Sequence, residues 1–369
     1  MNNRPDIFNV LRCIALFCVL GVHSKIVISS ANPSLNFPWY IYTPAWAAMW
    51  MFFTLSGYLL GKGFYNGKYK TETLDGVKQF YISRFVRIAP PYYLFIFLVF
   101  CFVNPVWFAT IDFKYVVKLL TFTYNGDGNP GIDGIGALWF ISTVVQCYVL
   151  APFVYEFVFK RLNKRQSFWM FCGIVVVGAM LRYYGRKAGY SPGDIYSSTI
   201  TNLDCFFGGL LFNAFTKNVD DSRLKKMMRP FSLIVLVGFI LVNTWFYANN
   251  LHMDMYRYRY PTVYILLFCM VFYAFDVKNR VRSTPLSLTE VAHNPLRLFD
   301  CMAVISYGMY LYHSNLLSVV PKILNAIGGG NYLSVSVLAG GVICVVAATI
   351  NYYAIEKPCN MIRKKGREK

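Results

Sequence analysis

Ten apolar stretches, each about as long as a membrane-crossing helix, alternate with short polar connections along the chain. An α-helix rises about 1.5 Å per residue, so about 20 apolar residues cover the ~30 Å hydrocarbon core of a bilayer. The pattern therefore predicts an all-α, polytopic membrane helical bundle with about ten transmembrane helices. The stretches lie near residues 8–29, 44–61, 88–106, 137–158, 167–184, 199–216, 230–248, 260–276, 301–320 and 333–355.

Composition supports this prediction. Hydrophobic residues make up 56% of the 369 positions and charged residues only 14%, whereas soluble domains carry about 25% charged residues. No polar connection is long enough to fold separately. We therefore expect one membrane domain over residues 7–358, followed by a basic cytoplasmic tail at residues 359–369. The ten cysteines lie in or beside apolar stretches without a CxxC pair, which is typical of small buried hydrophobic residues.

The net charge of +19 indicates membrane orientation rather than binding to nucleic acid. Of the 36 Lys and Arg residues, 26 fall at the termini or in the even-numbered connections, 9 fall in the odd-numbered connections, and Arg12 lies within the first stretch. Because cytoplasmic connections carry the basic excess, we expect both termini in the cytoplasm. The excess faces anionic lipid headgroups, and no nucleic-acid-binding motif accompanies it. Membrane lipids are therefore expected partners, and nucleic acid is not.

Two ionisable residues, Arg12 and His23, lie inside the first apolar stretch with ten uncharged residues between them. A charge in hydrocarbon costs about 2.5–3.5 kcal/mol on insertion scales, so each needs a partner, a wet cavity or a function. On one helix they would lie ~16 Å apart and on nearly the same face. An anion-binding cation and a base that titrates near neutral pH can then hold two parts of one long ligand. The pair also argues against a cleaved signal peptide, which this stretch otherwise imitates.

The other histidines are less informative. His252 and His293 fall in connections, where a solvated or structural side chain is the expected role. His313, in SYGMYLYHSNL, lies in the ninth stretch, where a hydrogen-bond partner for another helix and a functional residue are equally good interpretations. No His, Asp or Glu pair is spaced three or four residues apart on one apolar stretch, so we expect no metal site. The sequence also has no serine-hydrolase elbow and no phosphate-binding glycine loop.

Arg84 and Arg87, in SRFVRIAPPYY, share a helix face at the cytoplasmic end of the third stretch. They are either ordinary positive-inside anchors or a clamp for phosphate groups, which arginine binds through paired hydrogen bonds. Pro90 and Pro91 are expected to kink the helix or to begin it at this point. Asp204, in TNLDCFFGG, has three open interpretations: it pairs with a cation, hydrogen-bonds a sugar hydroxyl, or caps its helix.

Several motifs, in this order, resemble the acyltransferase 3 family of integral membrane acyltransferases over about residues 7–358. Each motif alone is weak, but their order and spacing together with ten apolar stretches are specific. The motifs are Arg12-x10-His23; FFTLSGYLLG (52–61), like FFxLSGFL; SRFVRIAPPYY (83–93), like RRxxRIxP; ALWFISTVVQCYVLAP (137–152); ISYGMYLYH (305–313); and AIEKP (354–358).

The resemblance implies a multi-pass O-acetyltransferase of the bacterial cytoplasmic (inner) membrane. Such enzymes move an acyl group, commonly acetyl from acetyl-CoA, to a hydroxyl of a cell-envelope saccharide or glycolipid such as O-antigen, capsule or exopolysaccharide. The implied co-substrate is acetyl-CoA, with no metal. The motifs assign catalysis to His23 and Arg12, and donor binding to Arg84, Arg87 and Arg12. As residues that bind the acceptor, we expect Trp139, Tyr148, Asp204, Tyr310 and His313.

The chain departs from the family pattern in its fourth stretch. Many members read LWSLSVEEQFY, but here Val144 and Val145 occupy the two glutamate positions, and Ala137 stands where related sequences carry histidine. A mechanism that needs that carboxylate is weakened, which leaves His23 as the chief base. Some relatives also carry a C-terminal extracytoplasmic esterase-like domain. The chain ends eleven residues after Pro358, so we expect transfer to be completed within the membrane domain.

The expected mechanism brings acetyl-CoA from the cytoplasm to the arginines and its thioester toward His23. His23 then acts as a general base on the acceptor hydroxyl or carries the acetyl group itself, and the sequence leaves both open. A secondary transporter of an anionic or sugar substrate is the alternative function, because intramembrane Arg and His suit it equally well. Against transport, no repeat relates the two halves of the chain, as it does in many transporters. A noncatalytic assembly partner is a third interpretation.

Overall fold

The computed structural model describes residues 6–31, 45–103, 106, 111–126, 134–216, 222–249, 259–276, 297–326 and 333–368. The chain forms two compact units. Unit 1 comprises Met1–Ala48, Val86–Phe97 and Val277–Lys369, and unit 2 comprises Met49–Phe85 and Leu98–Asp276. His252 and His293 lie outside the described residues.

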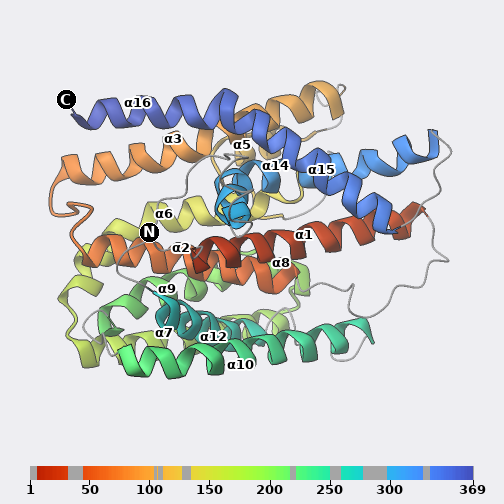
Figure 1. The fold of residues 1–369 in the computed structure, drawn as a ribbon. Helices are drawn as coiled ribbons and strands as arrows, with labels where there is room; N and C mark the ends of the chain where they lie inside the picture. Colours follow the sequence, from red (N-terminus) through yellow and green to blue (C-terminus); the bar gives the residue numbers. More distant parts are fainter. Residues whose placement is uncertain are drawn as a thin grey trace. The chain divides into compact units, whose positions relative to one another are not determined.

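Each of the ten predicted stretches contains an α-helix, and the described residues contain no strand, so the all-α prediction is confirmed (Figure 1). The ten helices are α1 (Ile7–Ala31), α2 (Ala45–Tyr65), α3 (Leu74–Leu98), α6 (Leu138–Phe157), α7 (Lys164–Lys187), α9 (Leu203–Thr216), α10 (Ser222–Ala248), α12 (Tyr260–Phe275), α14 (Arg297–Ala326) and α15 (Leu333–Asn351). Shorter elements are π-turns at Val99–Val103 and at Tyr352–Glu356 (η5), 3-10 turns at Phe159–Arg161 and Ile200–Asn202, and helices α5 (Phe113–Leu120), α8 (Pro192–Ser197) and α16 (Lys357–Glu368).

Within the described residues, six helical segments are long and apolar enough to cross a membrane. They are Ile7–Ser24, Leu74–Val103, Leu138–Arg161, Lys164–Lys187, Arg223–Phe246 and Leu338–Ile362. This supports a multi-pass membrane protein. Helices α9 and α12 have 14 and 16 residues, which is short of the ~20 that span hydrocarbon without bilayer thinning. The count of ten crossings therefore stays a prediction.

The third predicted stretch has a different start in the structure. Helix α3 begins at Leu74 and runs through both Pro90 and Pro91, so the prolines do not begin the helix. Each proline lacks the amide proton that the carbonyl four residues earlier would accept. In the same turn, the hydroxyl of Tyr307 on α14 donates to the carbonyl of Ile88 at 2.9 Å. The carbonyls that the prolines deprive of a donor are those of Val86 and Arg87, so the bond to Ile88 ties α3 to α14 and does not replace the missing bonds.

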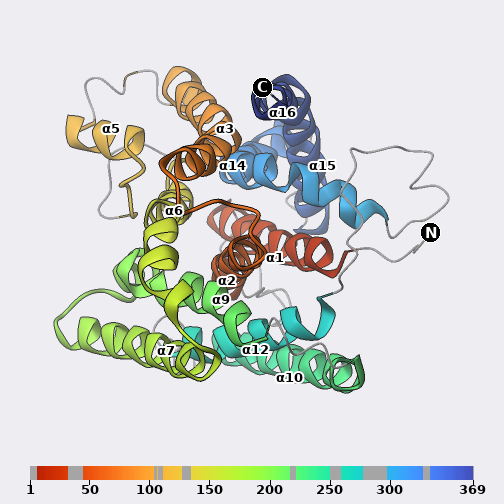
Figure 2. The ribbon, with the colours of Figure 1, turned by 90° about the vertical axis from the view of Figure 1, so that its left-hand side faces the viewer.

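Unit 1 is built around α14, which packs against both α1 and α15 (Figures 1 and 2). Helices α1 and α14 run parallel, because contacts between them recur at matching intervals: Asn9 meets Asp300, and His23 meets His313. Close packing of α14 on α15 depends on Gly308, where an added Cβ would lie only 3.1 Å from the Cα of Ala348. The π-turn η5 then joins α15 to α16.

Unit 2 has α9 at its core. Almost every residue from Asp204 to Leu211 is buried, and α9 packs against α6, α7 and α12. Helix α2 approaches α9 so closely that their backbones touch: an added Cβ on Gly57 or Gly61 would overlap the carbonyl oxygen of Phe206 or Leu210. Gly209 on α9 has the same relation to the carbonyl of Thr54. Small residues four apart allow such approach between membrane helices.

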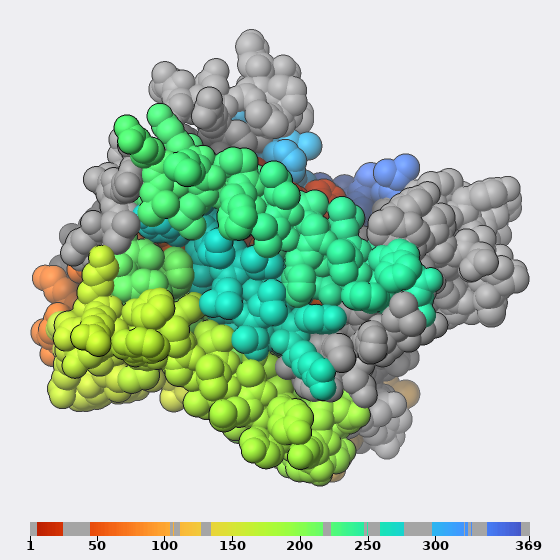
Figure 3. Space-filling view, turned by 90° about the horizontal axis from the view of Figure 1, so that it is seen from below, coloured from red at the N-terminus to blue at the C-terminus, as the bar shows by residue number. Residues whose placement is uncertain are grey.

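The outer face of α7 and α10 is apolar. Figure 3 shows α12 lying between these two helices on one face of unit 2. Large hydrophobic side chains are exposed along both, among them Trp169, Val177 and Met180 on α7, and Phe231 and Ile234 on α10. An exposed apolar surface of this kind is unfavourable in water and is the face expected to contact lipid tails.

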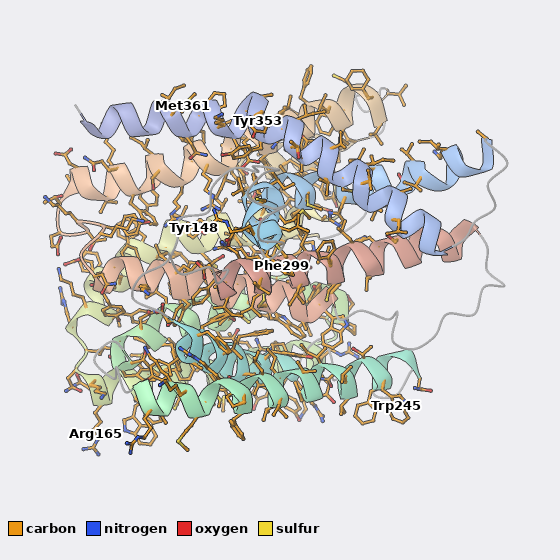
Figure 4. All side chains as sticks on the ribbon, viewed as in Figure 1. Tyr148, Arg165, Trp245, Phe299, Tyr353 and Met361 are labelled. Atoms are coloured by element: carbon orange, nitrogen blue, oxygen red, sulfur yellow. The ribbon has the colours of Figure 1, made fainter. Side chains whose placement is uncertain are left out.

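Basic and aromatic residues mark opposite ends of these helices. Arg165 lies at the start of α7 and Trp245 near the end of α10, at opposite ends of unit 2 in Figure 4. Basic residues concentrate on the cytoplasmic side of membrane proteins, and tryptophan is enriched at the membrane–water interface. The start of α7 is fixed by a capping box, in which Asn163 and Gln166 exchange side-chain to backbone hydrogen bonds.

A small ionic cluster ties the end of α6 to the α2–α3 connection. Lys160 donates to Glu72 at 2.7 Å and to Glu156 at 2.9 Å, and Thr71 donates to Glu156 at 2.7 Å. The hydrogen bond from Lys160 lowers the pKa of Glu72 below its usual value. The Lys160–Glu72 contact is therefore most stable where the Glu72 carboxylate is charged.

Candidate active site

The two intramembrane histidines meet in unit 1. The ring of His23 on α1 lies edge-on to the ring of His313 on α14, with ring centroids 4.6 Å apart and planes at 75°. His313 is completely buried, whereas His23 is partly exposed. His313 therefore reaches surrounding molecules only through its neighbours, and His23 is the member of the pair that can contact a substrate.

The hydrogen bonding of His313 defines its protonation. Its Nδ1 lies 2.6 Å from the carbonyl oxygen of Tyr310, one turn earlier on α14. A carbonyl oxygen only accepts hydrogen bonds, so Nδ1 carries the proton and Nε2 of the neutral ring carries a lone pair. Within the part of the chain that the structure describes, this Nε2 is buried without a hydrogen-bond partner. The site thus contains a basic lone pair beside His23.

Arg12 is held by a polar chain at the other end of α1. Its Nη1 donates to the side-chain oxygen of Asn9 at 3.1 Å, and the Asn9 amide donates to Asp300 on α14 at 2.8 Å. The Cys13 thiol adds a bond to the carbonyl of Phe299, which is labelled beside α1 in Figure 4. The structure therefore supplies the intramembrane arginine with polar neighbours. Because α1 is continuous from Ile7 to Ala31, Arg12 and His23 lie ~16 Å apart along one helix, as expected.

Arg87 lies on the part of α3 that belongs to unit 1. Its side chain is exposed, and its charge acts on the buried Glu356 of η5. The amide of Asn351 donates to Glu356 at 2.8 Å, and the hydroxyl of Tyr312 donates to Asn351 at 3.2 Å. This series of polar contacts runs from the exposed Arg87 side chain to Tyr312, the residue that precedes His313. Glu356 lies in the AIEKP motif but was given no role from the sequence, although a carboxylate at the end of an apolar helix was a usable signal.

Arg84 occupies an aromatic enclosure in unit 2. Its guanidinium donates to the hydroxyl of Tyr69 at 2.7 Å and lies 5.0 Å from the ring centroid of Tyr148 and 5.3 Å from that of Phe80. Figure 4 labels Tyr148, whose ring also packs edge-on against Phe206 of α9. The structure therefore brings Arg84 and Tyr148 together and engages both in packing.

Asp204 is the acidic half of a buried ion pair. Arg182 of α7 donates to its two carboxylate oxygens at 2.9 and 2.7 Å, and both side chains are at most 2% exposed. Arg182 also donates to the carbonyl of Thr201 and to the hydroxyl of Thr262. Gly178, one turn before Arg182, leaves the space that the carboxylate occupies. Of the three interpretations left open for Asp204, pairing with a cation is the one the structure contains.

Trp139 lies at the start of α6 within an aromatic group. Its ring centroid is 4.9 Å from that of Tyr196 and 6.1 Å from that of Phe53. One to two turns further along α6, Gln146 accepts from Thr199 at 2.8 Å and donates to the carbonyl of Phe122 at 2.8 Å. The glutamine therefore ties α6 to neighbouring loops. No cluster of three or more His, Cys, Asp or Glu residues able to hold a metal ion occurs among the residues described.

A sequence model of the acyltransferase 3 family, described as an acyltransferase domain, matches residues 6–353. The chain belongs to this family. Peptidoglycan O-acetyltransferase OatA of Listeria monocytogenes is 24% identical over 387 residues, which cover 96% of the chain and 55% of that protein. O-acetyltransferase OatA of Staphylococcus aureus is 24% identical over 343 residues, covering 85% of the chain and 52% of that protein. The chain thus spans about half the length of these curated relatives. No solved structure matches it.

The acyltransferase 3 motifs fall on the contacts described above. FFTLSGYLLG carries Gly57 and Gly61, which bring α2 against α9. ISYGMYLYH carries Tyr310 and His313, and AIEKP carries Glu356. In this member of the family, the motifs combine helix packing with the polar groups of unit 1.

Proposed function

We propose that this acyltransferase 3 protein transfers an acetyl group from cytoplasmic acetyl-CoA to a hydroxyl of a cell-envelope saccharide or glycolipid. It would do so in the bacterial cytoplasmic membrane, with ten crossings and both termini in the cytoplasm. The parallel run of α1 and α14 supports this arrangement, because a first and a ninth crossing have the same direction. The names of the OatA relatives support O-acetylation, and that of the Listeria protein makes peptidoglycan one acceptor to test.

The observation that carries the proposal is the position of His23. It shares one continuous helix with Arg12, is partly exposed, and contacts a buried histidine whose Nε2 bears a lone pair. A base near neutral pH and a cation at a different depth of the same helix suit a substrate that is anionic at one end and reactive at the other. Acetyl-CoA has this construction.

In the proposed reaction, the oxygen of an acceptor hydroxyl attacks the thioester carbonyl of acetyl-CoA. A C–O bond forms and the C–S bond breaks. His23 takes the hydroxyl proton and passes it to the departing thiolate, which leaves as the CoA thiol. General-base catalysis of this kind contributes about 10²–10⁴-fold. A route through an acetyl-imidazole on His23 uses the same residue and is distinguished by trapping the acetylated protein.

Arg87 and Arg12 are proposed to bind the phosphates of the donor. Arg87 is exposed and can form the paired hydrogen bonds that arginine makes with phosphate. Arg84 was expected to share this role, but its guanidinium contacts Tyr69, Phe80 and Tyr148, so we assign it the anchoring of its own unit.

Tyr310, in the same unit as His23, is proposed to contact the acceptor, because its ring offers a stacking face for sugars. Trp139 and Tyr148 belong to unit 2 and stay expectations from the sequence. Asp204 is left out because Arg182 already occupies its carboxylate. These assignments concern the acceptor alone and are independent of the role proposed for His23.

The test uses a strain that lacks the gene, complemented with wild type or His23→Ala. NMR of the envelope polysaccharides reports O-acetyl groups, and release of CoA thiol by the purified protein reports use of the donor. We expect His23→Ala to lose about 100-fold or more of the thiol release. Arg165→Gln, at an exposed position on α7, is the matched control and should retain wild-type activity. Full acetylation by His23→Ala would overturn the proposal, and so would a wild-type protein that leaves acetyl-CoA intact.

A further inference from the structure

The buried member of the histidine pair has no role in the reaction as written above. His313 contacts the ring of His23, the ring of Tyr310 at 5.4 Å and the carbonyl of Tyr310. Its complete burial keeps it from touching a substrate itself. Any part it plays in chemistry therefore passes through His23.

The two ring nitrogens of His313 have unequal surroundings. Nδ1 donates to the carbonyl of Tyr310, which uses its proton, whereas Nε2 is buried without a partner among the described residues. Leaving a buried acceptor unsatisfied costs about 1–3 kcal/mol. Native proteins satisfy most such atoms, and a redox or catalytic role is one of the explanations for the exceptions. The lone pair lies on the ring that meets His23.

The geometry points to His313 as a positioning residue that acts through His23, an inference that rests on the function proposed above. When His23 takes the proton of the acceptor hydroxyl at one nitrogen, the N–H at its other nitrogen donates to Nε2 of His313. Because the rings meet edge-on with centroids 4.6 Å apart, this bond requires the His23 ring to turn about its Cβ–Cγ bond. No proton leaves His313, and the proton held by His23 still goes to the CoA thiolate.

This bond would have two effects on His23. It selects the tautomer whose free nitrogen faces the acceptor, and it stabilises the imidazolium that forms in the transition state. A buried carboxylate would do the same with a full charge, whereas a neutral imidazole does so without placing an anion in the membrane interior. The apolar surroundings of unit 1 therefore suit histidine in this role.

Three substitutions separate this role from packing. His313→Phe keeps a ring but has no polar atom. His313→Asn keeps an amide donor near the place of Nδ1 and lacks an acceptor at the place of Nε2. His313→Gln reaches the place of Nε2 with an amide oxygen. Each is purified in nanodiscs and assayed for kcat and for KM toward acetyl-CoA, with polysaccharide extracted from the deletion strain as acceptor.

We expect His313→Phe and His313→Asn to lower kcat roughly 10–100-fold, by analogy with partners that orient metal-ligating histidines. The KM for acetyl-CoA should stay within twofold of wild type, and His313→Gln should recover much of kcat. A kcat within twofold of wild type in His313→Phe or His313→Asn would refute the role. So would a His313→Gln variant no faster than His313→Asn.

A double-mutant comparison covers the case in which a single variant folds poorly. In a His23→Gln background, His313→Asn should cost nothing further, because its effect passes through His23. A further loss of tenfold or more in thiol release would contradict the inference. If His23→Gln itself keeps full activity, the proposed function fails. If His23→Gln is inactive while His313→Asn is as active as wild type, only the role of His313 fails.

Discussion

Arg182 of α7 holds both carboxylate oxygens of Asp204 on α9, at 2.9 and 2.7 Å, in a place where neither side chain is more than 2% exposed. The two helices are thereby joined through a pair of opposite charges, and the carbonyl of Thr201 and the hydroxyl of Thr262 each accept a further hydrogen bond from the guanidinium. Removing one partner of such a pair leaves an uncompensated buried charge, whereas removing both partners leaves none.

We predict that Asp204→Ala lowers the free energy of unfolding by about 3–5 kcal/mol, because it leaves an uncompensated buried cation. The double variant Asp204→Leu with Arg182→Met should be much less destabilised, since it removes both charges and keeps apolar volume. Unfolding in mixed SDS and mild-detergent micelles measures both. Lys114→Ala removes an exposed ion pair and is the control with little effect. Wild-type stability of Asp204→Ala would count against a structural role for the pair.

The contact between α2 and α9 predicts that alanine substitutions at different glycines have very different effects on folding. Gly57→Ala should greatly reduce the yield of folded protein, because the new Cβ would overlap the carbonyl oxygen of Phe206. Gly238→Ala on α10 meets nothing within 4 Å and should be neutral or stabilising by up to ~1 kcal/mol through helix propensity. Size-exclusion chromatography and thermal unfolding compare the two. Equal yields would show that the two helices can separate freely.

The arginines of α3 are predicted to have separable effects. Arg87→Gln should raise the KM for acetyl-CoA roughly 10–100-fold, since a charge-assisted hydrogen bond contributes about 1.5–3 kcal/mol. Arg84→Gln should instead lower the melting temperature, because Tyr69, Phe80 and Tyr148 lose the guanidinium they surround. Arg165→Gln is again the control. A KM that is unaffected by Arg87→Gln would remove this residue from the donor site.

The cluster around Lys160 predicts a dependence on pH. The pKa of Glu72 is lowered in the folded protein by the Lys160 hydrogen bond, so its contribution is present above the pKa of the unfolded chain. That contribution is lost as the pH falls through the folded pKa. Thermal unfolding below the usual pKa of glutamate should therefore weaken wild type more than Glu72→Gln. If the melting temperatures of the two proteins fell equally as the pH was lowered, the cluster would add nothing to stability.

The helices were largely predictable from sequence, and their partners were not. Apolar length located all ten principal helices, and the spacing of Arg12 and His23 placed them correctly on one helix. The start of α3 was wrong because Pro90 and Pro91 were interpreted as a possible helix start, whereas α3 begins at Leu74 and continues through both.

Contacts between distant segments account for the rest. Nothing in the local sequence joins Asp204 to Arg182, or His23 to His313, because each pair depends on how two helices pack. The open alternatives for Asp204 and His313 reflect this directly. One helix pattern fits many partners, and only tertiary packing selects among them.

The bond that orients His313 lies within a single helix. Because Nδ1 donates to the carbonyl of Tyr310 on α14 itself, the choice of tautomer requires no contact with α1. The lone pair on Nε2 is therefore a local property of the sequence Tyr-Leu-Tyr-His and needs no other segment to create it. Contact with α1 adds the second histidine to a base that α14 itself orients.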